Sequence, residues 1–422
     1  MGLKVFKFGG ASVKDAAAVR NLVRIVKDYG IDNLIVVVSA MGKTTNALEK
    51  VIDDYYHGNP GLQADFQKIR DYHKSITGEL FGEDSDGEPA KVNSLFDELS
   101  AIISQPVTGS YDENYDRIVA FGELISTAII HAYLLKSGIK SKWFDIRKLI
   151  ITDDFHREAR VKWDITRQRI KAAAGECGKS CELMITQGFI AGDENGNTTT
   201  LGREGSDFSG AIIAYSADAE SLTIWKDVPG LLNADPKYFN NTQKIDTISY
   251  GETVELAYYG ATIIHPKTIK PLQNKKIPLY VRSFLSPANQ GTVIHTDQRK
   301  DHLIPSYIFK RNQVLISISP RDYSFMDEEN IAVIFSALAK FHIKVNMMQN
   351  SAISFSVCVD SRNHRVEKFI DEIKTDYRVR YNSNLELLTI RHYTPEVVER
   401  IAGKRKILLE QRSRTTLQLI MG

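Results

Sequence analysis

The segment Lys7-Phe8-Gly9-Gly10-Ala11-Ser12 places a lysine and two glycines at the end of a short apolar strand. This arrangement suits a phosphate, because glycines let the backbone approach an anion closely and the free N–H groups at a helix start point toward it. Lys7 adds a full positive charge. The alternative is a tight strand-to-helix turn with an exposed lysine, and this segment alone does not decide between the two.

A second glycine-containing segment, Gly202-Arg203-Glu204-Gly205-Ser206-Asp207, precedes a predicted helix. The planar guanidinium of Arg203 suits a bidentate contact with a carboxylate or a phosphate. Asp207 is a candidate to orient Lys7. The alternative is structural, because Ser206 or Asp207 would cap the helix.

The segment from Trp225 to Gly230 follows a predicted buried strand and precedes Asp235-Pro236-Lys237. Open α/β sheets bind ligands beyond the carboxyl ends of their strands, so Lys226 and Lys237 are candidates to face nucleotide phosphates. The alternative is a surface loop, because Val-Pro-Gly and Asp-Pro are common turn sequences.

Phe121-Gly122-Glu123 lies on a predicted helix. The carboxylate of Glu123 would accept hydrogen bonds from a substrate ammonium. The alternative is a solvated glutamate, which is the commoner role of a single glutamate on a helix.

The hydrophobic pattern predicts the strands and helices that position these segments. The apolar run Leu34-Ile35-Val36-Val37-Val38 is typical of a parallel strand that is covered on both faces. With the strand before Gly9 and a helix of 3.6-residue periodicity, it forms a β-α-β unit. Further strands are predicted at 183–186, 222–225 and 279–281. The sequence therefore predicts an α/β domain with a mostly parallel sheet.

The pattern changes after a polar segment at 296–302. The order β-α-β-β-α-β then follows at 314–319, 330–341, 344–348, 353–359, 366–374 and 377–381. A second, shorter copy runs through 385–391, 395–402, 407–411 and 415–420. Strand 306–310 is a candidate to complete the sheet of this copy. We predict domains at 1–298, 311–383 and 384–422.

Composition excludes several classes of protein. The chain has 422 residues, of which 43% are hydrophobic and 25% charged, and its formal net charge is +2. These values favour a globular protein and give no nucleic-acid footprint. No apolar run approaches the ~18 residues of a membrane span and no signal peptide is recognised, so we expect a cytoplasmic protein. Cys177 and Cys181 lack a second cysteine or histidine pair that would complete a zinc site, so we expect reduced thiols.

In their order along the chain, these motifs resemble those of the aspartokinases, members of the amino-acid kinase superfamily. The similar pairs are 7–13 with K-F-G-G-[TS]-S-V, 121–123 with F-G-E, 202–207 with G-R-G-G-S-D, 225–237 with W-T-D-V-x-G…D-P-R, and 260–266 with G-A-K-V-L-H-P. The tail is similar to a pair of ACT modules. The resemblance covers nearly the whole chain. It implies an amino-acid-kinase-like three-layer sandwich with a mostly parallel central sheet, followed by α+β ferredoxin-like ACT modules.

The resemblance also implies a reaction. ATP, with Mg²⁺ bound to the nucleotide, would phosphorylate the side-chain carboxylate of L-aspartate, as the first step toward lysine, threonine and methionine. The catalytic residues would be Lys7 and Asp207. The substrate-binding residues would be Ser39, Glu123, Arg203 and Ser206. The nucleotide-binding residues would be Gly9, Gly10, Lys226, Asp227 and Lys237. Because the attacking carboxylate is already ionised, positioning and electrostatics suffice without a general base.

Several residues depart from the family pattern. Ala11 removes a hydroxyl, Glu204 replaces a glycine, and Thr262 replaces a lysine that is expected at the nucleotide. Lys226, itself in the place of a threonine, and Lys267 are the candidates to supply the missing charge.

The tail implies regulation by an amino-acid effector. The residues in the position of the family's effector loop are Met347, Met348, Gln349, Asn350 and Ser351. Strand 415–420 is expected to be an exposed edge, which predicts a homodimer formed through the ACT modules. Two alternative functions remain. One is a kinase for another acidic amino acid, and the other is a weakly catalytic amino-acid sensor that regulates a partner.

Overall fold

The computed structural model describes residues 2–82, 89–180, 183–261, 264–322, 324–361, 364–403 and 405–422. The chain divides into two compact units. Unit 1 comprises residues 1–231, 244–254 and 263–298, and unit 2 comprises residues 232–243, 255–262 and 299–422. The predicted boundaries treat 1–298 as one continuous domain. In the structure, two segments inside that range group with unit 2 instead.

Unit 1 is built around an eight-stranded sheet with the order β10-β12-β11-β7-β1-β2-β4-β3. Every pairing in this sheet is parallel except that of β11 with β12. The strands are β1 (Lys4–Phe8), β2 (Leu34–Val38), β3 (Ser141–Phe144), β4 (Leu183–Gln187), β7 (Ser221–Lys226), β10 (Thr247–Ser249), β11 (Leu279–Ser283) and β12 (Thr292–His295). Two small ladders pair β5 (Ile190–Gly192) with β6 (Thr198–Thr200) and β8 (Leu231–Leu232) with β9 (Lys244–Ile245).

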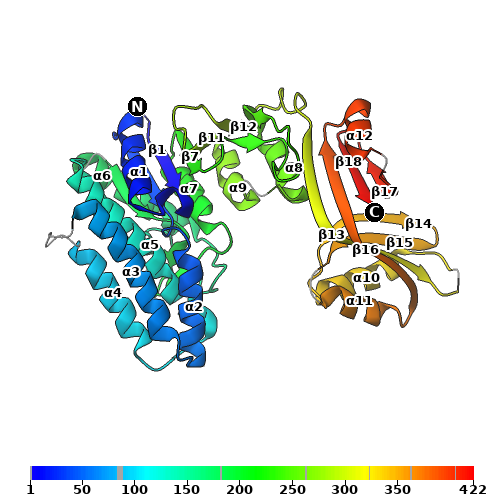
Figure 1. Cartoon of the computed structure of the whole chain (residues 1–422), viewed down its shortest axis with the longest axis horizontal. Coiled ribbons are helices and arrows are strands. Elements are labelled where there is room, and N and C mark those ends of the chain that lie inside the picture. The colour runs from blue at the N-terminus through cyan, green and yellow to red at the C-terminus, as the bar shows by residue number, and fades with distance from the viewer. Residues whose placement is uncertain are drawn as a thin grey trace. The chain divides into compact units, whose positions relative to one another are not determined.

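Helices cover both faces of this sheet, which gives three layers (Figure 1). On one face, α7 (Gly205–Ser216) packs against β1, β2 and β7, and α6 (Trp163–Ser180) and α9 (Pro266–Lys275) pack against α7. On the other face, α5 (Tyr111–Lys136) packs against β2, β3 and β4. Its layer also contains α1 (Ala16–Tyr29), α2 (Thr44–His57), α3 (Leu62–Phe81) and α4 (Ala90–Ile103). The remaining helices are the short η1 (Gly10–Val13) and η2 (Ile146–Lys148), and α8 (Tyr250–Tyr259), which begins in unit 1 and ends in unit 2.

Strand β1 separates an aromatic side from a charged side. Successive side chains of a strand point to opposite faces, so Phe6 and Phe8 lie on one face and Lys7 on the other. Phe8 stacks on Trp225 with ring centroids 5.9 Å apart. Lys7 faces α7, because a Cβ built on Gly210 would lie 3.5 Å from the Lys7 Cβ. The pleat of one buried strand therefore directs the lysine toward the first turn of α7.

Helix α5 is, among the described residues, the one helix that is long and apolar enough to cross a membrane. The sequence predicts no uninterrupted apolar run of this length, and α5 meets the criterion by overall length and composition alone. In the structure, 78% of the apolar stretch is buried inside the protein, as is typical of a core helix.

Unit 2 contains a six-stranded sheet with the order β14-β15-β13-β16-β18-β17. Its strands are β13 (Ser306–Pro320), β14 (Val345–Ser351), β15 (Ser354–Asp360), β16 (Tyr377–Arg391), β17 (Ile407–Arg412) and β18 (Thr416–Met421). The helices are α10 (Glu328–Lys340), α11 (Arg365–Ile373) and α12 (Pro395–Ala402). Strands β13 and β16 each run through both predicted modules, so the two modules share one sheet.

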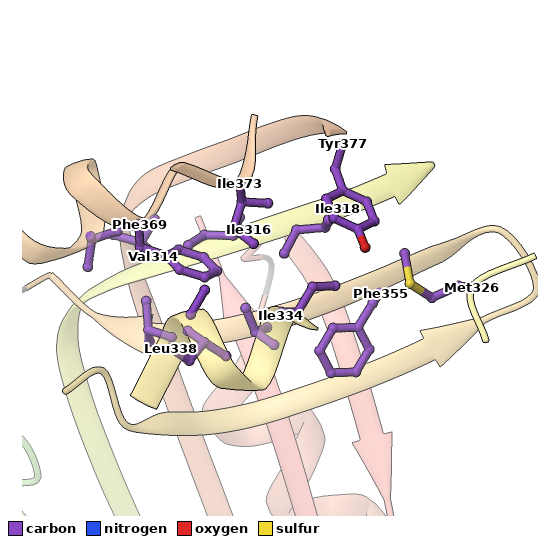
Figure 2. Packing of buried hydrophobic residues seen from close by; sticks show 14 residues of the cluster. Val314, Ile316, Ile318, Met326, Ile334, Leu338, Phe355, Phe369, Ile373 and Tyr377 are labelled. Carbon is purple, nitrogen blue, oxygen red and sulfur yellow. The ribbon is translucent and has the colours of Figure 1, made fainter. Parts of the chain in front are cut away.

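The core of the first module lies between the sheet and helices α10 and α11. Figure 2 shows this cluster, in which Ile316, Ile334 and Phe369 are fully buried. Apolar side chains alternate along β13 and recur at helical spacing along α10, so each element presents one apolar face to the other. This packing is consistent with a ferredoxin-like α+β module.

The strand pairing confirms one expectation about the tail and corrects another. Segment 306–310 does complete the second module, because it pairs with 387–391 of β16. The expectation of an unpaired edge at 415–420 is wrong, because β18 pairs with both β16 and β17. The outer strands of the described sheet are β14 and β17. A separate correction concerns Cys177, which is disulfide-bonded in the structure and not a reduced thiol.

Candidate active site

Two lysines share one buried carboxylate at the carboxyl end of the central strands. Lys7 Nζ lies 2.6 Å from Asp207 Oδ1, and Lys226 Nζ lies 3.2 Å from Asp207 Oδ2. Lys7 comes from β1, Lys226 ends the neighbouring β7, and Asp207 lies in the first turn of α7. The structure thus brings Lys7 together with two side chains that lie about two hundred residues further along the sequence.

The charges around Asp207 favour its ionised form. Burial raises the pKa of Asp207, but the charges of Lys7 and Lys226 outweigh burial and hold it below its usual value. Asp207 therefore stays ionised and orients two ammonium groups. The predicted capping role is wrong, because α7 begins after Glu204 and has no side-chain cap.

Glu123 is the second buried carboxylate of this region. It is 2% exposed, and its Oε1 accepts a hydrogen bond of 3.2 Å from the Ala40 N–H. Burial raises the pKa of Glu123 to about 8, which the Ala40 hydrogen bond and the positive charge of Lys7 only partly offset. A ligand ammonium would stabilise the ionised form.

A cavity of about 720 Å³ opens beside these groups. The four predicted substrate-binding residues, Ser39, Glu123, Arg203 and Ser206, all line it. Gly10 lines it too, so the cavity wall includes the turn that follows Lys7 and the residue that precedes Asp207. Two guanidinium groups, from Arg157 and Arg203, give the cavity a place for carboxylates.

Glycines make this close assembly possible at three points. A Cβ on Gly122 would lie 2.9 Å from the Ala40 Cβ, so the glycine lets α5 bring Glu123 against the backbone that follows β2. A Cβ on Gly10 would lie 2.8 Å from the Ala40 carbonyl oxygen. A Cβ on Gly188 would lie 2.7 Å from Ser206 Oγ. Each distance is shorter than ordinary contact, so a larger residue would force the walls apart.

Asp116 is not in the cavity lining, but it forms hydrogen bonds to residues that are. It is fully buried and accepts hydrogen bonds from Thr200 Oγ1 at 2.6 Å and from the Arg157 N–H at 3.0 Å. His156 Nδ1 lies 2.9 Å from the same carboxylate. Burial raises the pKa of Asp116, and these hydrogen bonds offset only part of that rise. Asp116 thus joins helix α5, the loop at 156–157 and β6.

Sequence reasoning missed several residues that line the cavity. They are Ala40, Gly42, Thr45, Asn46, Glu49, Tyr115, Arg157, Glu158, Phe189 and Thr200. One sequence signal could have pointed to Thr45, which lies at the start of α2. Gly42 lies between β2 and this helix, just as Gly9 and Gly10 follow β1 at the other glycine-containing turn. Arg157 gave no such signal, since it lies in an irregular loop without periodicity.

Other predicted residues are not part of this assembly. Asp227 is exposed just after β7, and Lys267 is exposed at the start of α9. Lys237 belongs to segment 232–243 of unit 2. Thr262 lies outside the described residues.

The predicted effector residues do not form a loop. Met347 to Ser351 belong to strand β14, in which Met347 is buried beside Cys358 and Met348 is half-exposed. Their assignment to an effector stays a prediction. Among the side chains that the structure describes, no group of three or more His, Cys, Asp and Glu residues is arranged to hold a metal ion.

Comparison with known proteins adds to this geometry. The model of the amino acid kinase family matches residues 2–283. Lysine-sensitive aspartokinase 3 of Escherichia coli K12 is 31% identical over 359 residues, which cover 85% of this chain and 78% of that protein. The chain belongs to the aspartokinases of the amino acid kinase family. A plant aspartokinase, the chloroplastic aspartokinase 1 of Arabidopsis thaliana, is 28% identical over 84% of this chain and 63% of its own length.

Solved aspartokinase structures match the whole fold. Escherichia coli aspartokinase III in complex with lysine and aspartate, a T-state, has a TM-score of 0.82 at 26% identity and covers 99% of this chain and 95% of its own. The same enzyme in complex with aspartate and ADP, an R-state, has a TM-score of 0.80 at 25% identity and covers 99% and 96%. These matches confirm the predicted fold class, a three-layer kinase sandwich followed by ACT-type modules.

Proposed function

We propose that this aspartokinase transfers the γ-phosphate of ATP to the side-chain carboxylate of L-aspartate, giving 4-phospho-L-aspartate and ADP. The observation that carries the proposal is the Lys7–Asp207–Lys226 cluster beside a cavity that holds two arginines and a buried glutamate. The relatives support it, because a solved relative binds both aspartate and ADP. The product is an activated acid on the route to lysine, threonine and methionine.

The aspartate would lie in the 720 Å³ cavity. Arg203 would bind the α-carboxylate, Glu123 the ammonium, and Ser39 and Ser206 the remaining polar groups. The side-chain carboxylate would then point toward the Lys7 cluster. Because binding fixes the attacking oxygen in place, it removes much of the entropic cost of the reaction.

In the chemical step, one oxygen of the aspartate carboxylate attacks the γ-phosphorus. The bond from that phosphorus to the bridging oxygen breaks, and ADP leaves with its electrons. No proton moves, since the nucleophile is ionised at neutral pH. Lys7 and Lys226 would stabilise the charge on the transferred phosphoryl group, and a single contact of this type is worth about 10²–10³ in rate.

ATP would enter as its Mg²⁺ complex. Gly9 and Gly10 would leave room for the phosphates, and Lys226, rather than the exposed Lys267, would supply the charge that is missing at Thr262. Asp227 would contact the rest of the nucleotide.

We propose an amino-acid effector on unit 2, because a relative is lysine-sensitive and was solved with lysine bound. The exposed side of β14, from Met348 to Ser351, is the proposed location. A homodimer would form through an outer strand of the unit 2 sheet, β14 or β17, since an outer strand offers unpaired backbone groups. The cytoplasmic location expected from the sequence stays a prediction.

The deciding experiment is a coupled assay of ADP release with MgATP and L-aspartate, with L-glutamate in parallel. We expect turnover with aspartate and little with glutamate. The reverse preference would assign the chain to another acidic amino acid. No turnover with either would favour the regulatory sensor. Repeating the assay with added lysine or threonine tests the effector.

A further inference from the structure

Two carboxylate oxygens in the wall of the substrate cavity are buried and have no hydrogen-bond partner. They are Oε2 of Glu123 and Oε2 of Glu204. Other described side chains also carry unpartnered buried atoms, but of that set only these two residues line this cavity. A buried carboxylate oxygen needs a donor, because burial removes the water that would otherwise supply one. The cavity is therefore built for a ligand with at least two N–H donors.

The position of Glu204 makes this carboxylate unusual. Glu204 has φ 55° and ψ 24°, in the left-handed region that favours glycine. The aspartokinase pattern that this segment resembles has glycine there. A residue with a Cβ is held in this conformation at a cost, which indicates that the side chain itself contributes something. The backbone of Glu204 also starts α7, since its carbonyl accepts the Asp207 N–H at 3.1 Å.

The chemistry of the two oxygens selects the ligand group. A primary ammonium has three N–H donors and a full positive charge, so it carries enough donors for both carboxylates that line the cavity. Arg203, the residue directly before Glu204, also lines the cavity, but its guanidinium donates no hydrogen bond to Glu204 Oε2 in the described structure. The substrate ammonium is thus the group that fits.

We propose that Glu204 is a specificity-determining residue, which binds the α-ammonium of the substrate together with Glu123. This inference rests on the proposed function. Its consequence is that the cavity rejects dicarboxylates without an ammonium. Succinate keeps both carboxylates of aspartate but would leave the buried Oε2 atoms of Glu123 and Glu204 without an N–H donor. A site with unpaired buried polar groups discriminates strongly against the analogue that lacks them.

The test compares aspartate with succinate as phosphoryl acceptors in the full-length protein. Both products are acyl phosphates, so hydroxylamine traps either as a hydroxamate, and ADP release gives a second readout. The variants are Glu204→Ala and Glu204→Gly. Both remove the carboxylate, but only glycine also relieves the left-handed backbone. We expect each variant to lower kcat/KM for aspartate about 10–100-fold through KM and to leave kcat/KM for succinate unchanged or higher, so that selectivity falls by at least the same factor.

Glu79→Gln is the matched control, because Glu79 is an exposed glutamate on α3 outside the cavity lining. It should leave the selectivity unchanged. If Ala lowers activity and Gly restores it, the backbone and not the carboxylate is responsible, and the proposal is wrong. Unchanged selectivity in both variants also overturns it. Failure of the wild type to phosphorylate aspartate would instead refute the proposed function.

Discussion

Lys226 Nζ lies 3.2 Å from Asp207 Oδ2, while Lys7 Nζ contacts the other oxygen of the same carboxylate. The aspartokinase pattern has a threonine in place of Lys226 and a lysine in place of Thr262. The structure thus puts an extra ammonium at the end of β7 in a chain that lacks one at position 262.

Replacing Lys226 with threonine, the residue of the family pattern, tests whether Lys226 takes the place of the lysine that is missing at position 262. Lys226→Thr should raise the KM for ATP about tenfold, because one charge facing the phosphates is lost. The KM for aspartate should stay within about twofold. Lys267→Thr is the companion variant. If it raises the KM for ATP more than Lys226→Thr does, the positive charge that faces the phosphates comes from α9 instead. Steady-state kinetics with each substrate varied in turn give both constants.

Lys7→Ala should lower kcat about 10²–10³-fold and change the aspartate KM little. The reason is that Lys7 acts on charge that develops in the transition state, not on bound substrate. A coupled ADP assay measures both constants, and Lys7→Arg serves as the charge-retaining comparison. A near-normal kcat in the alanine variant would exclude Lys7 from the chemical step.

The raised pKa of Glu123 predicts a pH effect on stability. Its pKa is about 8 in the fold and near 4.5 when unfolded, so the folded state holds the proton more tightly. The stability that this provides is complete below pH 4.5 and is lost as pH rises through about 8. Thermal melts without substrate should therefore show wild type losing more stability than Glu123→Gln between pH 6 and 9. Parallel losses in both proteins would contradict the assignment.

The same residue predicts a pH effect on binding. An ammonium binds the ionised form of Glu123, so aspartate affinity should improve as pH rises from 6.5 toward 8.5. At a pH well below 8, binding should release a proton. Calorimetry in buffers of different ionisation enthalpy measures that release, and Glu123→Gln should abolish it. Binding without proton release in the wild type would mean that the ammonium lies elsewhere.

Arg203→Lys keeps the positive charge at the cavity but loses the planar guanidinium that can bind a carboxylate through two hydrogen bonds. We expect the aspartate KM to rise about tenfold while the KM for ATP barely moves. Should ATP affinity fall instead while aspartate affinity is normal, the two subsites have been assigned the wrong way round.

Asp116→Ala should destabilise the fold and widen the cavity. Every donor left unpaired in the interior costs roughly 1–3 kcal/mol, and Thr200 and the Arg157 backbone both lose their acceptor. We expect a lower Tm together with a raised aspartate KM. Saturating aspartate should recover part of the lost Tm. An unchanged Tm would show that water replaces the carboxylate.

The sequence predicts much of the site because parallel strands end at one edge. Lys7 and Lys226 lie at the carboxyl ends of apolar strands, so the pattern predicts that both are at the same edge of the sheet, whereas the pairing of β1 with β7 comes from the structure. Glu123 needed the family resemblance, since a glutamate on a helix gives no direction by itself. The left-handed backbone of Glu204 had no local signal other than the glycine that the family pattern places there.

The tail was harder to predict for a physical reason. Strands β13 and β16 continue through register shifts near Lys310 and Gln313, where the alternation of side chains breaks. The hydrophobic pattern therefore predicts two short strands in place of each long one, at 306–310 and 314–319 for β13 and at 377–381 and 385–391 for β16. Strand β18 looked like an edge because its partners lie on both sides of it in space but only on one side in the sequence. Loop residues such as Arg157 carry no periodicity that would place them in the cavity.

The route of the chain also determines how this protein can be dissected. Segments 232–243 and 255–262 are joined at both ends to unit 1 but group with unit 2, where the Asn233 carbonyl accepts the Tyr307 N–H at 2.7 Å. Phe239 there stacks on Tyr307 with ring centroids 5.5 Å apart. Ending the chain at residue 298 would leave both segments attached to the kinase unit and strip away these partners. A truncated kinase would thus expose aromatic side chains and tend to aggregate, so that loss of inhibition in such a fragment would say little about the effector. Point substitutions on the exposed side of β14, in the intact chain, are the experiment that separates regulation from folding.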